Sequence, residues 1–201
     1  MLYKLVYSIV LFWFRVFYGL RIYGRENVRP GAMIVAGNHT SMGDPIHAAA
    51  AMPDAMRLRF MAKAELFRFP PLRWLIVALG AYPIERGAGD IGALRKSVEM
   101  LENGQKLLIF PNGTRSDEEN PDNAKSGAAL LACKSGVPVL PVYISPKRRF
   151  LRRRHFIVIG ESYIAKLPEG MPRAEGYRHV TRELMTRIYS LRAVGEKQHE
   201  R

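Results

Sequence analysis

The sequence predicts an α/β fold, in which a single domain has a mostly parallel central sheet flanked by helices. Short apolar runs typical of buried strands alternate along the chain with longer helix-like stretches. The chain has 201 residues, enough for one conventional core, and no linker is long enough to separate two domains. An apolar and aromatic N-terminal helix precedes the domain. We therefore expect a membrane-associating helix over residues 1–24, the domain over 25–195 and a polar tail over 196–201.

The N-terminal stretch Met1–Leu20 is nearly all apolar, and only Lys4, Ser8 and Arg15 interrupt it. On a helix these three side chains fall within a sector of about 40°, with Trp13 on the opposite side. Such a thin polar seam is typical of a helix that lies in the bilayer interface. A span is disfavoured because few uncharged residues separate Lys4 from Arg15, and a signal peptide because no small-residue cleavage site follows. A helix packed on the core remains the other alternative.

Six short apolar runs predict the strands of the sheet. In chain order they are Ala32–Ala36, Arg59–Ala62, Ala81–Ile84, Lys106–Phe110, Val137–Tyr143 and His155–Ile159. Five longer stretches between and after these runs predict helices. In chain order they are Pro45–Met52, Pro71–Leu79, Asp90–Glu102, Ala124–Lys134 and Ala174–Val194. Strands that alternate with helices favour parallel pairing, because a helical crossover returns the chain to the same end of the sheet.

Local signals mark the ends of several elements. Asp44 is a suitable N-cap for the first predicted helix, and Pro45 suits the first helical position because no N–H donor is needed there. Asn103-Gly104 ends the third helix in the expected way. The polar, acidic stretch over residues 116–124 predicts a mobile surface loop.

The formal net charge of +13 implies an anionic partner, which is membrane lipid, nucleic acid or an acidic substrate. The run Lys147–Arg154 holds six cations in eight residues. Together with the apolar N-terminus it favours an anionic membrane surface. No helix-turn-helix cue, zinc finger or ribonucleoprotein motif supports nucleic acid, so we expect no nucleic-acid partner. A solvated charged loop is the remaining alternative.

The single cysteine, Cys133, excludes an internal disulfide framework and is compatible with a reducing compartment. It lies in a helix-like apolar run. We therefore expect a buried, inert thiol rather than a nucleophile.

The most informative motif is the turn Asn38–Pro45, which joins a predicted strand to a predicted helix. It brings His39 and Asp44 close together in the sequence. A carboxylate that reaches one imidazole nitrogen fixes the tautomer and leaves the other nitrogen free as a base. The alternative is that Asp44 only caps a helix and that His39 is an ordinary loop histidine.

Three further motifs follow this turn, at Gly80–Gly87, Phe110–Ser116 and Val137–Val142. In this order the four blocks resemble those of the glycerolipid acyltransferase family, whose best-known members are the 1-acylglycerol-3-phosphate acyltransferases. The resemblance spans roughly residues 30 to 145. Two positions depart from the family pattern. Glu85 stands where Asp is common, and Asn112 stands where the family has Glu, so the third block loses a negative charge.

The resemblance implies a membrane-associated O-acyltransferase of phospholipid biosynthesis on the cytoplasmic face. It would move a fatty acyl group from a thioester of coenzyme A or acyl carrier protein to the free hydroxyl of 1-acylglycerol-3-phosphate, with no other cofactor and no metal. His39 would be the general base, oriented by Asp44, which would also stabilise the imidazolium. Ser41 is not in a Gly-x-Ser-x-Gly elbow, so direct attack by the acceptor, without an acyl-enzyme, is favoured.

The second and third blocks supply the predicted substrate-binding residues. A loop at the carboxyl end of a strand is where α/β sheets place ligands, and Gly113 permits close approach there. Thr114 and Arg115 offer a hydroxyl and a guanidinium fork for phosphate. The resemblance adds Arg86 as a second phosphate contact, and Asn112 at the position where the family has Glu. The predicted set is Arg86, Asn112, Gly113, Thr114 and Arg115.

Three alternatives remain open. In the first, the acceptor is another lyso-lipid or a glycerol phosphate, because Asn112 departs from the family pattern. In the second, the chain is a non-catalytic protein that binds anionic membrane through its N-terminal helix and Lys147–Arg154. In the third, His39, Asp44 and His47 are three ligands of a metal ion, although no fourth ligand is evident.

Overall fold

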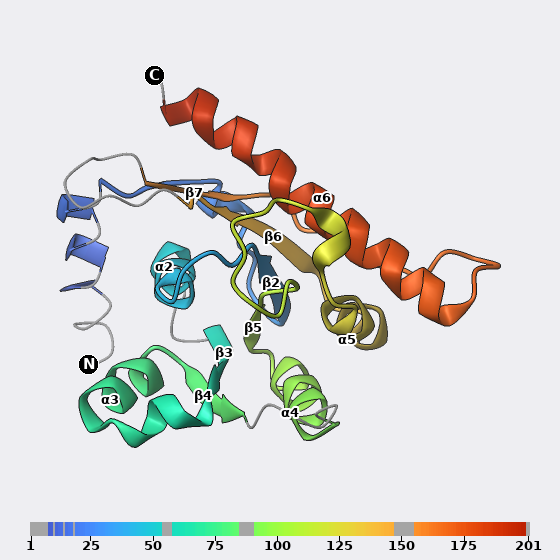
Figure 1. Ribbon diagram of the computed structural model, residues 1–201, viewed down its shortest axis with the longest axis horizontal. Coiled ribbons are helices and arrows are strands. Elements are labelled where there is room, and N and C mark those ends of the chain that lie inside the picture. Colours follow the sequence, from blue (N-terminus) through green and yellow to red (C-terminus); the bar gives the residue numbers. More distant parts are fainter. Residues whose placement is uncertain are drawn as a thin grey trace.

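The computed structural model describes residues 8–9, 11–13, 15–17, 19–53, 58–84, 91–146 and 155–199. Its centre is a seven-stranded sheet in the order β1-β7-β6-β2-β5-β3-β4 (Figure 1). The strands are β1 (Arg21–Tyr23), β2 (Met33–Gly37), β3 (Leu58–Lys63), β4 (Ala81–Ile84), β5 (Lys106–Ile109), β6 (Val139–Ile144) and β7 (Phe156–Ile159). Neighbours from β6 to β4 pair in parallel, whereas β7 runs antiparallel to β6 and β1 pairs in parallel with β7. The predicted α/β fold with a mostly parallel sheet is confirmed.

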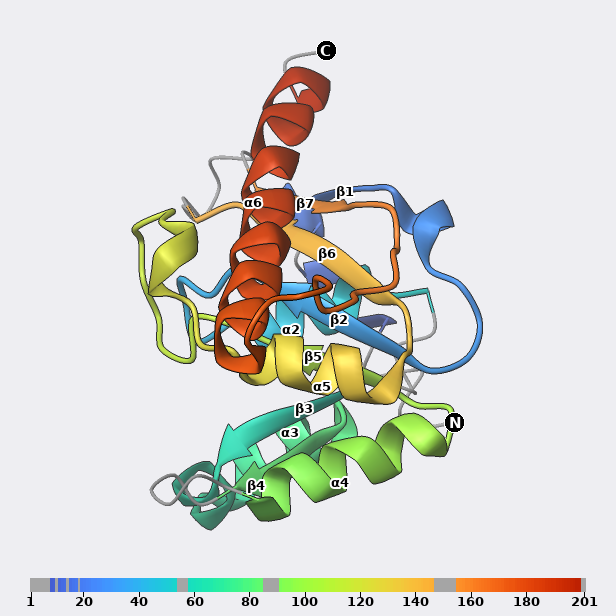
Figure 2. The same ribbon diagram turned by 90° about the vertical axis from the view of Figure 1, so that its right-hand side faces the viewer.

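Helices cover both faces of this sheet (Figures 1 and 2). One face carries α4 (Ile91–Glu102), α5 (Gly127–Ser135) and α6 (Arg173–His199), and the other carries α2 (Asp44–Ala51) and α3 (Pro70–Ala78). Short 3₁₀ helices are η1 (Arg25–Asn27), η3 (Ala64–Arg68) and η4 (Pro121–Asn123). Two apolar cores result, one between the sheet and each helical layer.

Strand β2 shows why the sheet is buried on both sides. Ile34 and Ala36 pack toward α5 and α6, whereas Met33 and Val35 pack toward α2 and α3. Successive side chains of a strand point to opposite faces, so a run without polar residues suits a strand covered on both faces. All six predicted strands form, with ends that differ by up to two residues.

The sequence analysis missed β1, which pairs with β7 at the edge of the sheet. Its three residues, Arg21–Tyr23, are exposed or half-buried and carry no apolar pattern. The prediction places them in the membrane-associating segment 1–24, whereas the structure places them in the sheet, so the folded domain begins before residue 25. The preceding Leu20 is already buried in the core beneath α2 and α3.

Helix α6 extends to His199, beyond the predicted end at Val194. The segment 196–199 was expected to belong to a polar tail but is helical. Gly195 explains how closely this helix approaches the sheet, because a Cβ atom there would lie 2.2 Å from Cε2 of Phe156. Arg192 and Glu196 add an ion pair of 2.9 Å one turn apart.

The acidic loop 116–124 lies on the surface but is anchored at several points. Tyr143 Oη donates a hydrogen bond of 2.7 Å to Glu119 Oε1, and Arg192 Nη1 lies 3.2 Å from Glu119 Oε2. Burial and this hydrogen bond raise the pKa of Tyr143, which therefore stays a donor. A second ion pair joins Arg182 to Asp122. The expectation of a mobile loop is not supported, because contacts to β6 and α6 hold it.

The N-terminal segment is helical at the described positions between residues 8 and 17. Leu11 packs against the core beneath α2 and α3, whereas Ile9, Phe12, Trp13 and Val16 are exposed. Within the described ranges, no helix is both long and apolar enough to cross a bilayer. The basic run 147–154 lies outside the described residues.

Candidate active site

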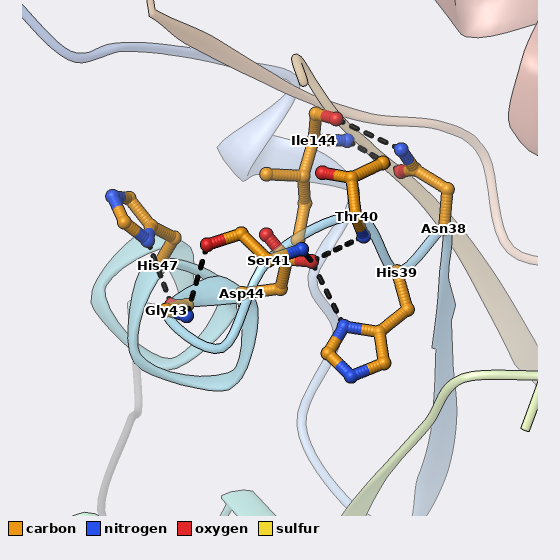
Figure 3. A network of polar contacts seen from close by, with 8 residues as sticks. All are labelled: Asn38, His39, Thr40, Ser41, Gly43, Asp44, His47 and Ile144. Atoms are coloured by element: carbon orange, nitrogen blue, oxygen red, sulfur yellow. Dashed lines mark hydrogen bonds and ion pairs between the residues drawn. The ribbon is translucent and has the colours of Figure 1, made fainter. Parts of the chain in front are cut away.

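Asn38 holds the turn that follows β2 in place. It is buried, its Nδ2 donates 2.9 Å to the carbonyl oxygen of Ile144, and its Oδ1 accepts 2.8 Å from the Ile144 amide (Figure 3). These two bonds satisfy the Asn38 amide with the end of strand β6. The neighbouring His39 is therefore fixed at the carboxyl edge of the sheet.

Asp44 is fully buried and does not cap its own helix. Helix α2 starts at Asp44 itself, with Gly43 in the N-cap position and without a capping side chain. A single carboxylate oxygen, Oδ2, instead accepts from the amides of Thr40 at 2.6 Å and Ser41 at 2.7 Å, and from His39 Nδ1 at 2.9 Å. The alternative that Asp44 only caps a helix is therefore wrong, because the carboxylate points back into the turn.

His39 has the orientation that a general base requires. Since a carboxylate only accepts, Nδ1 of the neutral ring carries the proton and Nε2 carries the lone pair. Figure 3 shows Nε2 pointing away from Asp44, and the side chain retains 17% exposure. The ring stacks on Phe110, with centroids 4.3 Å apart and an interplanar angle of 19°. Two contacts thus hold the imidazole while its second nitrogen faces away from the carboxylate.

The third motif lies beside this histidine because β5 is the parallel neighbour of β2. The loop after β5 turns at Gly113, whose φ of 70° is left-handed, and the Gly113 amide donates 2.9 Å to the Phe110 carbonyl. The Ser116 amide then donates 2.9 Å to the carbonyl of His39. The structure therefore brings Gly113, Thr114 and Arg115 next to the His39 turn. Thr114 and Arg115 are exposed there.

Asn112 lies differently from the other predicted substrate-binding residues. Only 6% of it is exposed, and its Nδ2 donates a long hydrogen bond of 3.4 Å to Tyr189 Oη on α6. Burial raises the pKa of Tyr189. The hydrogen bond from Asn112 lowers this pKa by a smaller amount, so the net shift is upward. Asn112 Oδ1 is buried without a hydrogen-bond partner in the described structure. The side chain is thus directed at α6, not at solvent with Thr114 and Arg115.

The second motif begins at strand β4, which ends at Ile84 and is parallel to β3. Its carboxyl end lies at the same edge of the sheet as those of β2 and β5, because these strands all run in one direction. Glu85 and Arg86 lie outside the described residues, so the predicted phosphate contact of Arg86 remains a prediction.

An apolar cavity of about 180 Å³ opens beside the site. Phe110 connects the two, because its ring stacks on His39 and also lines the cavity. The remaining wall comes mainly from α4, α5 and the third motif, including Leu94, Gly113 and Leu131, with Lys125 as its charged member. A larger cavity of about 320 Å³ lies between η4 and α6, and none of its lining residues belongs to the four motifs.

His47 does not complete a metal site with His39 and Asp44. It is buried one turn into α2, and its Nδ1 donates 2.7 Å to the Gly43 carbonyl, away from His39 (Figure 3). Among the described residues, no three His, Cys, Asp or Glu side chains form a group suited to a metal ion.

The chain is similar to known proteins in sequence and in fold. A model of the family described as Acyltransferase matches residues 19–145, well over half of the chain. The chain belongs to the acyltransferase family. The crystal structure of the 1-acyl-sn-glycerophosphate (LPA) acyltransferase PlsC from Thermotoga maritima superposes on this chain with a TM-score of 0.65 and 28% identity, covering 95% of this chain and 80% of that one.

Curated relatives agree with this assignment. The 1-acyl-sn-glycerol-3-phosphate acyltransferase of Bacillus subtilis is 26% identical over 86% of this chain and 88% of its own length. The lyso-ornithine lipid O-acyltransferase of Pseudomonas aeruginosa is 34% identical over 64% of this chain and 48% of its own. Against the chloroplastic enzymes of Brassica napus and Arabidopsis thaliana, the match spans only 37% and 36% of the relative's length.

The sequence analysis missed two contributors to the candidate site. Asn38 stands next to His39 in the motif, a position that could have drawn attention, but its partner Ile144 is distant in the sequence. Phe110 is predicted as the end of a strand and the start of the third motif, with no role for its ring, whereas that ring supports the imidazole of His39. Neither contact follows from spacing, because both join segments from different strands.

Proposed function

We propose that this acyltransferase is membrane-associated and transfers a fatty acyl group from a thioester of coenzyme A or acyl carrier protein to the free hydroxyl of 1-acylglycerol-3-phosphate. The observation that carries the proposal is the 2.9 Å contact between His39 Nδ1 and Asp44, with Nε2 directed away from the carboxylate on a side chain that is 17% exposed. The relatives named for this acceptor support its identity.

The reaction proceeds by direct transfer. His39 Nε2 takes the proton of the acceptor hydroxyl, whose oxygen attacks the thioester carbonyl carbon, and Asp44 stabilises the resulting imidazolium. The carbon–sulfur bond then breaks, and the leaving thiolate receives the proton from His39. Among the described residues, Ser41 and Cys133 do not support an acyl-enzyme. Ser41 Oγ accepts from the Gly43 amide, and burial raises the pKa of the Cys133 thiol.

The two substrates have distinct surroundings. The cavity beside Phe110 is apolar and suits part of the acyl chain, whereas the exposed Thr114 and Arg115 suit the acceptor phosphate. Arg86 completes the phosphate site in this proposal. Another lyso-lipid is the second candidate acceptor, because Asn112 departs from the family pattern and a lyso-ornithine lipid O-acyltransferase is among the relatives.

An acceptor screen tests the proposed activity. Purified protein in lipid vesicles is given an acyl-coenzyme A or an acyl carrier protein thioester together with 1-acylglycerol-3-phosphate, lyso-ornithine lipid or glycerol-3-phosphate, and the products are identified by mass spectrometry. We expect phosphatidic acid in the first mixture. Product from another acceptor alone would redirect the proposal, and absence of any product would favour the non-catalytic, membrane-binding alternative.

Replacing Arg115 by alanine should raise the acceptor KM by about tenfold or more, because charge-assisted hydrogen bonds to phosphate are lost. The donor KM should stay the same. Steady-state kinetics with each substrate varied measures both constants. Arg178→Ala, which removes an exposed arginine of α6, is the matched control and should change neither. An unchanged acceptor KM in Arg115→Ala would exclude the phosphate contact.

Asn112→Glu restores the family residue and should increase activity toward 1-acylglycerol-3-phosphate if that is the acceptor. It should also lower the free energy of unfolding by about 1–3 kcal/mol, because a carboxylate enters a buried position whose described side-chain partner is Tyr189. Kinetics and thermal unfolding separate the two effects. Asn112→Gln, of equal length but uncharged, is the control. Equal activity in all three proteins would show that position 112 does not influence the acceptor.

A further inference from the structure

Large apolar side chains that are exposed are concentrated in three segments. Ten such side chains occur in the described residues, and eight of them belong to the N-terminal segment, the turn before α2, or α3 with the residue before it. These eight are Ile9, Phe12, Trp13, Val16, Met42, Phe69, Trp74 and Val77. The N-terminal segment and α3 cover the same core, because Leu11 and Leu75 both pack against it, and Figure 1 shows both on the α2 side of the sheet.

Helix α3 is apolar on two sides, one of which packs on the core while the other is exposed. The inner side packs against the core and consists of Leu72, Leu75 and Ile76. On a helical wheel with Pro70 at 0°, these three side chains are centred at about 190°. Trp74 and Val77 lie near about 40° and 340°, on the opposite side, where Trp74 is 53% exposed. Phe69, just before the helix, is 62% exposed. A nine-residue helix that is apolar on its outer side needs a second apolar surface to cover it.

Charges around this face indicate what covers it. Lys63, Arg68 and Arg73 are exposed on the same stretch, and Glu65 is its only acidic residue among positions 58–84. Tryptophan and phenylalanine flanked by basic side chains fit the boundary between acyl chains and anionic headgroups. A second copy docked symmetrically would instead bring Arg68 and Arg73 near their own counterparts, and like charges repel.

We infer that Phe69, Trp74 and Val77 form a second membrane-docking surface, which inserts into an anionic leaflet together with the exposed side of the N-terminal segment. The role of this surface rests on the proposed function. It would hold the His39 turn at the membrane surface that carries the lyso-lipid. Met42, two residues before Asp44 in that turn, is itself 65% exposed and apolar. Two separate contacts fix the orientation of the domain on the leaflet, whereas one helix alone leaves it free to rotate.

Tryptophan fluorescence tests the inference without requiring turnover. The chain has two tryptophans, so Trp13→Phe leaves Trp74 as the sole reporter and Trp74→Phe leaves Trp13. Each full-length variant is mixed with vesicles of phosphatidylcholine and phosphatidylglycerol, with and without brominated acyl chains. We expect a blue shift of Trp74 emission and quenching by the brominated lipid. A Trp74 spectrum that does not respond while Trp13 does would overturn the inference.

Vesicle flotation supplies a second measurement. Trp74→Ser should weaken vesicle binding by about tenfold, because a large apolar side chain no longer inserts. The control is Val194→Ser, which removes an apolar side chain of similar exposure on α6, across the sheet, and should bind like the wild type. Equal binding of all three proteins would overturn the inference. A lipid-free dimer that Trp74→Ser dissociates, seen by analytical ultracentrifugation, would assign the face to a second copy instead.

Failure of the acyl-transfer assays and failure of the docking surface are distinguishable. If Trp74 is quenched by brominated lipid but no acceptor is acylated, the surface stands and the proposed reaction falls. If acylation proceeds while Trp74 stays in water, the proposed reaction is supported and the second docking surface is refuted.

Discussion

Replacing His39 by alanine is expected to lower the rate of acyl transfer by about 10²- to 10⁴-fold, because it removes the general base. The fold should survive the change. The imidazole is partly exposed, and the Asp44 carboxylate keeps the amides of Thr40 and Ser41 as donors when the ring is gone. Single-turnover and steady-state rates on vesicle-borne acceptor measure the loss, and circular dichroism with thermal unfolding checks the fold.

His39→Gln is the matched variant for this prediction. Its amide keeps a polar side chain that can bond to Asp44 and lie on Phe110, but it has no basic nitrogen. We expect it to be as inactive as His39→Ala. Turnover at the wild-type rate by either purified variant would mean that His39 does not act as the base.

Replacing Asp44 by asparagine should reduce the rate by about tenfold to a hundredfold, less than the loss of His39. The amide oxygen of asparagine can accept from the Thr40 and Ser41 amides and from His39 Nδ1, as Asp44 Oδ2 does. It cannot balance the charge of the imidazolium, so a charge-assisted bond becomes a neutral one, at a cost of roughly 1.5–3 kcal/mol in the transition state. The measurement is kcat at saturating substrates.

Asp44→Ala separates the catalytic from the structural role of this carboxylate. Alanine leaves three donors without their acceptor in a buried turn, so the free energy of unfolding should fall by at least about 1–3 kcal/mol. Asp44→Asn should unfold close to the wild type. If both variants lose stability equally, the charge of Asp44, not its hydrogen bonding, holds the turn.

Spacing and residue type predicted the part of the site that is local in the chain. His39 and Asp44 lie in one turn between a strand and a helix, so their contact requires no distant partner. The strands were predictable for a similar reason. Buried on both faces, β2, β5 and β6 appear in the sequence as short apolar runs, whereas the exposed edge strand β1 has no such signal.

Competing local chemistry explains the error at Asp44. An aspartate before proline at the start of an apolar stretch is a good N-cap, and nothing in the local sequence distinguishes this from an aspartate that bonds backward. In the folded chain, helix α2 starts one residue earlier, and the carboxylate meets His39 and the two preceding amides. The imidazole supplies a donor that a simple cap does not have.

The amino-acid sequence was sufficient for the α/β fold, for the strand-to-helix turn with its acid–base pair, and for the family resemblance that the comparison confirmed. The tertiary structure decided which distant groups complete the site. Asn38 is hydrogen-bonded to the backbone of Ile144, and Asn112 is directed toward Tyr189. The ring of His39 stacks on Phe110, and the His39 carbonyl accepts a hydrogen bond from the Ser116 amide. It also decided that Trp74 faces outward. Helical periodicity identifies the sides of a helix, but only packing against the sheet determines which apolar side is buried and which remains exposed.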